Sequence, residues 1–178
     1  MNKNFKLAFS SVCVSLGTVL MLITIILPIA NYALAALAGL ITCAVVIEIN
    51  VKYAFSVYLA ISLLSLLLLP DKEAITLFII FFGYYPIIKY FIEKIKNKII
   101  QIIIKLITFN ISAILFFFIS INLLNIPEDS FYVFGLSIPI IILTIGNIVF
   151  LIYDYTVTGL ISIYINYLHP KIKKSLKF

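Results

Sequence analysis

Long apolar runs, separated only by short polar or charged stretches, constrain this chain more than any other feature. A helix of about 20 residues crosses the roughly 30 Å hydrocarbon core of a bilayer, and it satisfies its own backbone hydrogen bonds there. Runs of this length are therefore expected to be membrane-spanning helices. We predict six of them, at residues 7–27, 33–49, 53–69, 74–92, 99–124 and 131–153.

The composition indicates that much of the protein's surface faces lipid rather than water. Hydrophobic residues make up 64% of the chain and charged residues only 11%, with a mean hydropathy of +1.23. A water-soluble domain usually carries about 25% charged residues. The predicted fold class is therefore all-α, a polytopic membrane protein in which residues 1–178 form one integral membrane domain with a basic tail at 154–178.

Prolines mark several of the predicted helix boundaries. Pro28 follows the first run, Pro70 ends the third, and Pro86 predicts a kink within the fourth. The sixth run is less sharply bounded, because residues 154–168 remain compatible with a helix. A single helix over 131–168 would be about 57 Å long, so we expect a bend near 154–159 or an extension lying at the membrane interface.

The positions of the lysines predict the orientation of the chain. Positive residues accumulate on the cytoplasmic side of membrane proteins, and with both termini inside only Lys72 of the 13 positive residues would face outward. The predicted topology is thus N-in/C-in. The lysines placed inside are Lys3, Lys6, Lys52, Lys89, Lys94, Lys96, Lys98, Lys105, Lys171, Lys173, Lys174 and Lys177.

The same composition indicates a source and a location. All positive residues are lysine, and abundant Ile, Lys and Asn without Arg are typical of an AT-rich genome. We therefore expect a multi-pass protein of the cell membrane, the inner or plasma membrane of a bacterium. Short lysine clusters beside apolar runs favour contact with anionic lipid and argue against nucleic-acid binding.

Two acidic residues fall inside apolar runs, where a charge is costly and marks a functional candidate. They are Glu48 and Asp154, predicted to lie at the depth of Lys52, Lys89 and Lys105. Three interpretations remain open: ion pairs with snorkelling lysines, a cytoplasmic surface for coupling to a partner, or a proton relay.

Polar and small residues within the predicted helices allow both structural and functional interpretations. Asn110 and Asn147 need hydrogen-bond partners at membrane depth, either in a neighbouring helix or in a ligand. Small residues recur at four-residue spacing at Ala35, Gly39 and Cys43, which favours close helix contact within the protein or with a partner. The aromatic segment 81–86 either lines a cavity or simply packs.

Enzymatic chemistry has little support in the sequence. The chain has one histidine, His169, so a two-histidine metal site cannot be built from it alone. Serine-hydrolase, zinc-protease and phosphate-loop motifs are absent from the sequence. We therefore predict no catalytic residues, no metal and no cofactor.

The number of helices, the short external loops and the basic cytoplasmic tail resemble the substrate-binding S components of energy-coupling factor transporters. The segments 83–86 and 153–155 are similar to those of uncharacterised clostridial membrane proteins of this size. The S-component resemblance implies capture of a vitamin-like solute from outside, and a T subunit with two ATPases as partners. That family carries an Ala-xxx-Ala stripe in its first helix, where this chain has Ser11 and Ser15.

Two functional hypotheses follow. The first is a non-catalytic membrane subunit that binds a small solute between the outer halves of its helices. The candidate solute-binding residues are Asn31, Tyr32, Asn122, Asn125 and Tyr132, and the candidate partner-coupling residues are Glu48, Lys52, Lys89, Lys105 and Asp154. The alternative is a structural or regulatory membrane protein whose cytoplasmic lysines recruit a partner or anionic lipid.

Overall fold

The computed structural model describes residues 3–70, 72–122, 132–133 and 136–170, and its description of side chains in the last helix begins at residue 143. Within these residues the chain is almost entirely helical. The main helices are α1 (Lys3–Ile23), α2 (Asn31–Glu48), α3 (Val51–Leu68), α4 (Lys72–Leu77), α5 (Tyr85–Ile92), α6 (Lys98–Asn122) and α7 (Ile138–Ile163). Shorter elements are the 3₁₀ turn η1 (Pro28–Ala30), the π-helical turns η2 (Phe78–Phe82) and η4 (Tyr164–Leu168), and the paired strands β1 (Tyr132–Val133) and β2 (Leu136–Ser137).

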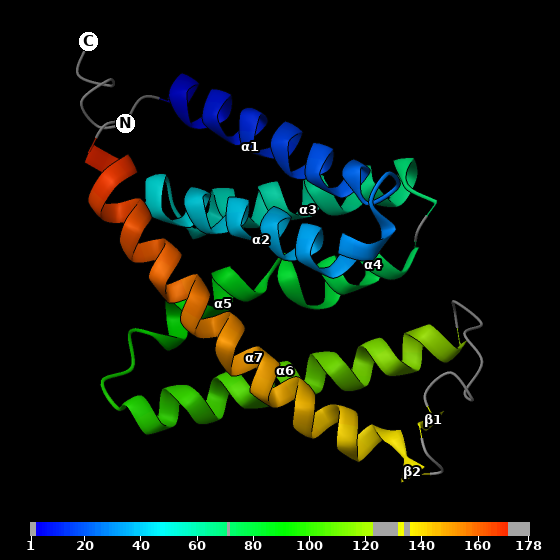
Figure 1. The fold of residues 1–178 in the computed structure, drawn as a ribbon. Coiled ribbons are helices and arrows are strands. Elements are labelled where there is room, and N and C mark those ends of the chain that lie inside the picture. The colour runs from blue at the N-terminus through cyan, green and yellow to red at the C-terminus, as the bar shows by residue number, and fades with distance from the viewer. Residues whose placement is uncertain (1–2, 71, 123–131, 134–135, 171–178) are drawn as a thin grey trace.

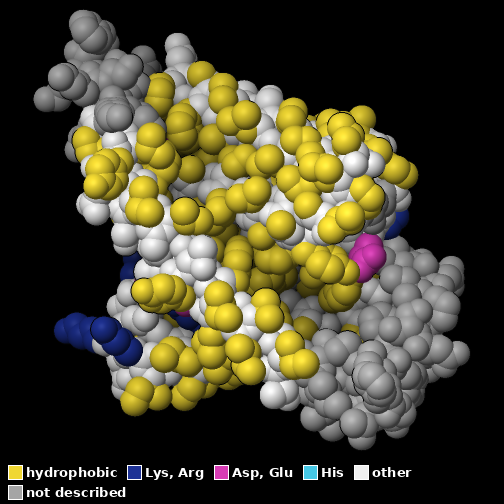
Figure 2. Space-filling view, in the orientation of Figure 1, with side chains coloured by type: hydrophobic (Ala, Val, Ile, Leu, Met, Phe, Trp, Pro, Cys, Tyr) yellow, Lys and Arg dark blue, Asp and Glu magenta, His cyan; other side chains and the backbone are white. Residues whose placement is uncertain are grey.

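Six helical segments in the described part of the chain are long and apolar enough to cross a membrane, as the sequence predicted. They are Lys3–Ile23, Pro28–Glu48, Val51–Leu68, Lys72–Ile92, Lys98–Asn122 and Leu143–Leu168. Large apolar side chains cover much of the visible flank of the molecule (Figure 2). This is the all-α architecture of a multi-pass membrane protein.

Helix α2 lies at the centre of the main bundle, between α1, α3 and the α4–α5 segment (Figure 1). Its small residues Ala35, Ala38 and Gly39 are buried against these neighbours. Gly39 permits the closest of these approaches, since a Cβ there would lie 2.9 Å from the carbonyl carbon of Phe82 in η2. The small-residue stripe therefore serves packing within the chain, which allows large side chains elsewhere to face outward.

The fourth span is interrupted in its middle. The π-helical turn η2 follows α4, and a turn at Gly83 and Tyr84 precedes α5, with Pro86 in the first turn of α5. Proline is accommodated there because the first N–H groups of a helix have no intrahelical partner. The kink expected near Pro86 is present as this interruption.

The sixth span differs from its predicted range of 131–153. Helix α7 continues without interruption through Asp154 and Gly159 to Ile163, so the chain has no break at 154–159, and the alternative of a helical extension stays a prediction. The Asp154 carboxylate within this helix is paired with lysines of two other helices. Helix α7 crosses α6 obliquely (Figure 1).

The described lysines separate between the two ends of the bundle. One end, the lysine-rich end, contains the starts of α1, α3 and α6 and the ends of α2, α5 and α7 (Figure 1). Its described lysines are Lys3, Lys6, Lys52, Lys89, Lys94, Lys96, Lys98 and Lys105. At the opposite end Lys72 donates hydrogen bonds of 2.9 Å to the carbonyls of Leu66 and Leu69, and so caps the end of α3.

Candidate functional site

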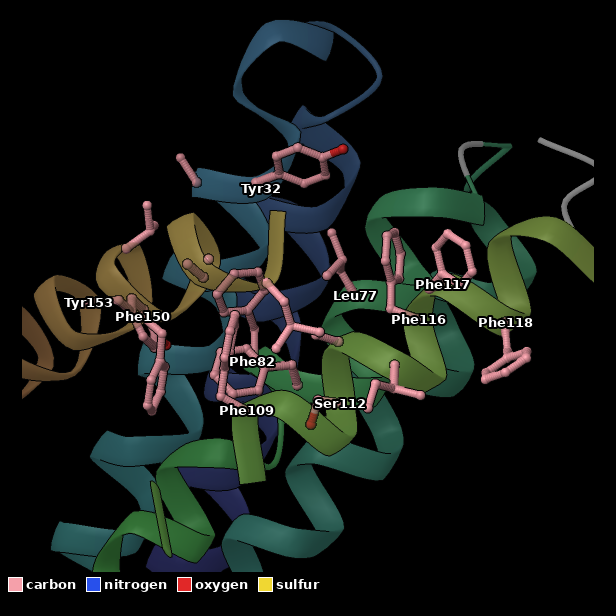
Figure 3. A pocket seen from close by; sticks show the side chains of 18 residues that line it. Tyr32, Leu77, Phe82, Phe109, Ser112, Phe116, Phe117, Phe118, Phe150 and Tyr153 are labelled. Atoms are coloured by element: carbon pink, nitrogen blue, oxygen red, sulfur yellow. The ribbon is translucent and has the colours of Figure 1, made fainter. Parts of the chain in front are cut away.

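A cavity of about 660 Å³ lies between α2, the α4–η2 segment, α6 and α7 (Figure 3). It occupies the half of these helices that is farther from the lysine-rich end. Its walls are aromatic and aliphatic, with hydroxyl groups as the only polar side-chain groups. The lining residues are Tyr32, Ala33, Ala36, Leu77, Phe81, Phe82, Phe109, Ser112, Ala113, Ile114, Phe116, Phe117, Phe118, Leu143, Gly146, Val149, Phe150 and Tyr153.

Packed aromatic rings separate this cavity from the lysine-rich end. The rings of Phe109 and Phe150 stack with centroids 4.8 Å apart, which joins α6 to α7. Phe81 contacts both of these rings and also Tyr85, at 5.0 Å. Such pairs contribute about 0.5–1.5 kcal/mol each beyond simple burial. This aromatic floor therefore holds α6 and α7 against the fourth span.

The η2 turn places Phe81 and Phe82 at the floor. A π-helical turn inserts one residue into the helical repeat and so changes which side chains face a neighbour. The Thr42 hydroxyl of α2 lies 2.7 Å from the carbonyl oxygen of Gly39 and 3.0 Å from that of Gly83, so its one proton is shared between them and links the interrupted segment to α2. The segment 81–86 thus packs against α2, α6 and α7, and its residues Phe81 and Phe82 also line the cavity.

The hydroxyl groups at the cavity have different environments. Ser112 is hydrogen-bonded to Tyr84 at 2.6 Å and donates to the carbonyl of Thr108. Tyr32 donates to the carboxylate of Glu73 at the opposite end. The buried hydroxyl of Tyr153 makes no hydrogen bond with the described residues. The cavity therefore offers a ligand few polar contacts.

An ion-pair cluster lies on the other side of the aromatic floor and joins three helices. Lys89 of α5 is 1% exposed and contacts Glu93 at 2.9 Å, Asp154 of α7, and the hydroxyl of Thr158 at 2.8 Å. Lys105 of α6 contacts Asp154 at 2.7 Å and Glu93 at 3.3 Å. Two lysines thus balance two carboxylates, which is the condition under which buried charges are tolerated.

Tyr85 connects the floor to this cluster. Its ring is fully buried among Phe81, Phe150 and Tyr153, and its hydroxyl donates a 2.6 Å hydrogen bond to Asp154. Tyr85 therefore belongs to both the aromatic floor and the hydrogen bonds of the ion-pair cluster.

Glu48 belongs to a different cluster. Its side chain is almost completely buried at the end of α2, where Tyr164 and Nδ1 of His169 both lie 3.0 Å from its carboxylate. This contact fastens the end of α7–η4 to α2. His169, which the sequence placed in a basic tail, is thus part of the folded structure.

The predicted partner-coupling residues are therefore divided among three locations. Lys89, Lys105 and Asp154 meet in the ion-pair cluster, and Glu48 lies apart with His169. Lys52 is exposed and its side chain has no partner among the described residues. It lines a second hollow at the lysine-rich end, together with Asn50, Phe91, Ile161 and Ile165 among others.

The predicted solute-binding residues are also divided. Tyr32 lines the cavity, whereas Asn31 and Asn122 do not. Asn122 bonds instead to the carbonyl of Phe118. Asn125 and the side chain of Tyr132 lie outside the described part of the structure. The aromatic residues of the cavity wall were not among the predicted ones, and the phenylalanines of 109–118 were the available signal for them.

Asn110 and Asn147 pair with each other across α6 and α7. Each amide nitrogen donates to the other residue's side-chain oxygen at 3.1 Å, and each also donates to the carbonyl four residues earlier in its own helix. The two side chains thus satisfy each other within the membrane-spanning region, in keeping with a structural role rather than a ligand contact.

Replacing Asn110 by Leu is expected to lower the free energy of unfolding by about 0.6–2 kcal/mol, because inter-helix hydrogen bonds in membranes are worth this much. Unfolding in mixed micelles of mild detergent and SDS measures the change. The double variant Asn110→Leu/Asn147→Leu should cost less than the sum of the single variants. Strict additivity would contradict a direct pair.

No group of three or more His, Cys, Asp or Glu side chains within the described residues is arranged to hold a metal ion. The fold and the cavity together define a helical multi-pass membrane protein with an apolar site between its helices. Comparison with protein-family models, with curated proteins and with solved structures finds no significant match to this chain.

Proposed function

We propose that this protein is a non-catalytic membrane subunit that binds a small molecule between the outer halves of its helices. The observation that carries the proposal is the cavity of about 660 Å³, which lies within the range of about 300–1,000 Å³ for small-molecule sites. Its position in the half away from the lysines agrees with capture from the outer side.

The proposal includes an N-in/C-in orientation in a bacterial plasma membrane. Its support is the separation of the described lysines, with Lys72 alone at the opposite end, together with the positive-inside rule. Single cysteines at Lys52 and Lys72, in a Cys13→Ser/Cys43→Ser background, test it. In intact cells an impermeant maleimide should label the cysteine at 72 and spare the one at 52; the reverse pattern would invert the topology.

The S-component resemblance adds a proposed partner, a T subunit with ATPases on the cytoplasmic side. Purification in mild detergent, followed by mass spectrometry of proteins and of extracted small molecules, tests both parts. A bound small molecule together with an ATPase-linked partner is the expected result. Finding neither would overturn the proposal.

A matched pair of substitutions assigns any co-purifying molecule to the cavity. Ala113→Phe places a ring inside the cavity, whereas Ala8→Phe adds the same ring to an exposed position of α1. We expect the molecule to be lost from the Ala113 variant and retained by the Ala8 variant. Equal retention in both variants would place the molecule elsewhere.

A second candidate function is recruitment of a partner or anionic lipid by the lysine-rich end. Lys52 favours it, since its side chain is exposed, has no partner among the described residues and lines a hollow that also contains Asn50, Lys89 and Glu93. Deleting residues 171–178 should then abolish the function without affecting membrane insertion. A small-molecule-binding subunit should tolerate that deletion.

A further inference from the structure

The walls of the cavity exclude most chemical classes of ligand. Of the 18 lining residues only Tyr32, Ser112 and Tyr153 carry a polar side-chain group, and none carries a charge or an amide. The hydroxyl of Ser112 is already bonded to Tyr84 and to a backbone carbonyl. A polar solute would lose most of its hydration here and find only the hydroxyls of Tyr32 and Tyr153 in exchange, so the walls fit a hydrocarbon.

The cavity also opens toward the lipid side of the molecule. Three of its lining residues, Ile114, Phe118 and Val149, are themselves about half exposed, so the wall continues into the outer surface of α6 and α7. Figure 2 shows a hollow with hydrophobic side chains on this flank, between the α1–α4 region and the crossing pair α6 and α7. A ligand can therefore enter sideways from the bilayer.

The depth of the cavity matches one leaflet. Along α6 the lining extends from Phe109 to Phe118, which is about 15 Å for ten residues at 1.5 Å per residue. Half of a hydrocarbon core of about 30 Å is about 15 Å. Away from the lysine-rich end the lining reaches Tyr32, whose hydroxyl contacts the Glu73 carboxylate. The polar headgroup of the lipid would lie beside these two residues.

From these observations we infer that the cavity takes the apolar chain of a membrane lipid, drawn from the leaflet at the opposite end. The inference rests on the proposed function, since it names the ligand class of the same cavity. The chain lies between the aromatic rings of α6 and the fourth span, its terminal methyl group faces the floor formed by Phe81 and Phe150, and its headgroup remains at the membrane surface.

Photo-crosslinking tests this inference directly. The full chain is reconstituted in nanodiscs of phosphatidylcholine containing a phosphatidylcholine with a diazirine on its acyl chain, irradiated, digested and mapped by mass spectrometry. Labels are expected at the inward-facing Phe116 and Phe117 in excess of the exposed Ile111 and Leu115 on the same helix. Equal labelling of the two faces would overturn the inference, and this comparison needs no variant.

Variants from two walls make the test independent of any one substitution. Ala113→Phe and Ala36→Leu each fill part of the cavity, and each methylene displaced weakens chain binding about fourfold. Cavity labelling should fall by about tenfold or more in both, and remain unchanged in Ala8→Phe. Unchanged labelling in both cavity variants would also overturn the inference.

The outcomes separate this inference from the proposed function. If a polar molecule co-purifies and is lost in Ala113→Phe while the acyl label remains on the outer faces, the proposed function stands and the lipid inference is wrong. If neither a small molecule nor the acyl label depends on the cavity variants, both are wrong.

Discussion

Replacing Asp154 by Asn should lower the free energy of unfolding by about 3–5 kcal/mol, the cost of removing one partner from a buried ion pair. Asp154 is the residue on which the charges of α5, α6 and α7 converge, since it accepts from Lys89, Lys105 and Tyr85. Without its charge, two buried lysines share the single carboxylate of Glu93. Unfolding in mixed micelles of mild detergent and SDS measures the loss.

The matched controls for this prediction are an exposed charge and a compensating variant. Lys98→Gln neutralises an exposed charge at the same end of the molecule and should change stability by less than about 0.5 kcal/mol. The double variant Asp154→Asn/Lys105→Met should recover part of the loss, because it removes the surplus positive charge. If Asp154→Asn proves as mild as Lys98→Gln, the cluster does not stabilise the fold.

Replacing Gly39 by Ala is expected to destabilise the protein by about 1–3 kcal/mol or more, although Ala is the better helix former. A Cβ at this position would collide with the backbone oxygen of Phe82 and lie 2.9 Å from its carbonyl carbon. Backbone atoms cannot rotate away as a side chain can, so α2 and η2 must separate. Because Phe82 also lines the cavity, small-molecule retention should fall with stability.

Gly159 provides the same substitution in open space. It lies in α7, and a Cβ added there meets no atom within 4 Å. Gly159→Ala should therefore be neutral or stabilising by up to about 1 kcal/mol, as expected for removing glycine from a helix. If both variants lose similar amounts of stability, the close approach of η2 is not the reason for glycine at position 39.

The prediction of six spans succeeded because it depends on length and hydropathy, which are local properties. Pro86 likewise predicted a kink in the fourth span, and the helix is interrupted just before it. The predicted end of the sixth helix was wrong. The span was ended at 153 because a helix over 131–168 exceeds the bilayer thickness, whereas α7 continues past Asp154, whose charge is paired with Lys89 and Lys105 from 65 and 49 positions away.

The candidate site was only partly predictable from the sequence. Glu48 and Asp154 were grouped because each is a charge within an apolar run at a similar depth, and the structure assigns them to separate clusters. The proposed solute-binding asparagines were chosen for polarity, whereas the cavity is lined by rings from α6, α7 and η2. Rings of this kind also fill cores, so the sequence could not distinguish a wall from a core.

The six spans and the clustering of the lysines could be predicted from local sequence, because the cost of placing polar groups in lipid acts on each segment independently. Which helices contact one another became visible only in the folded chain. The close approach permitted by Gly39, the convergence of α5, α6 and α7 on Asp154, and the space left between α2 and the crossing pair α6 and α7 all depend on contacts between distant residues. Such contacts are set by the shapes of several helices together.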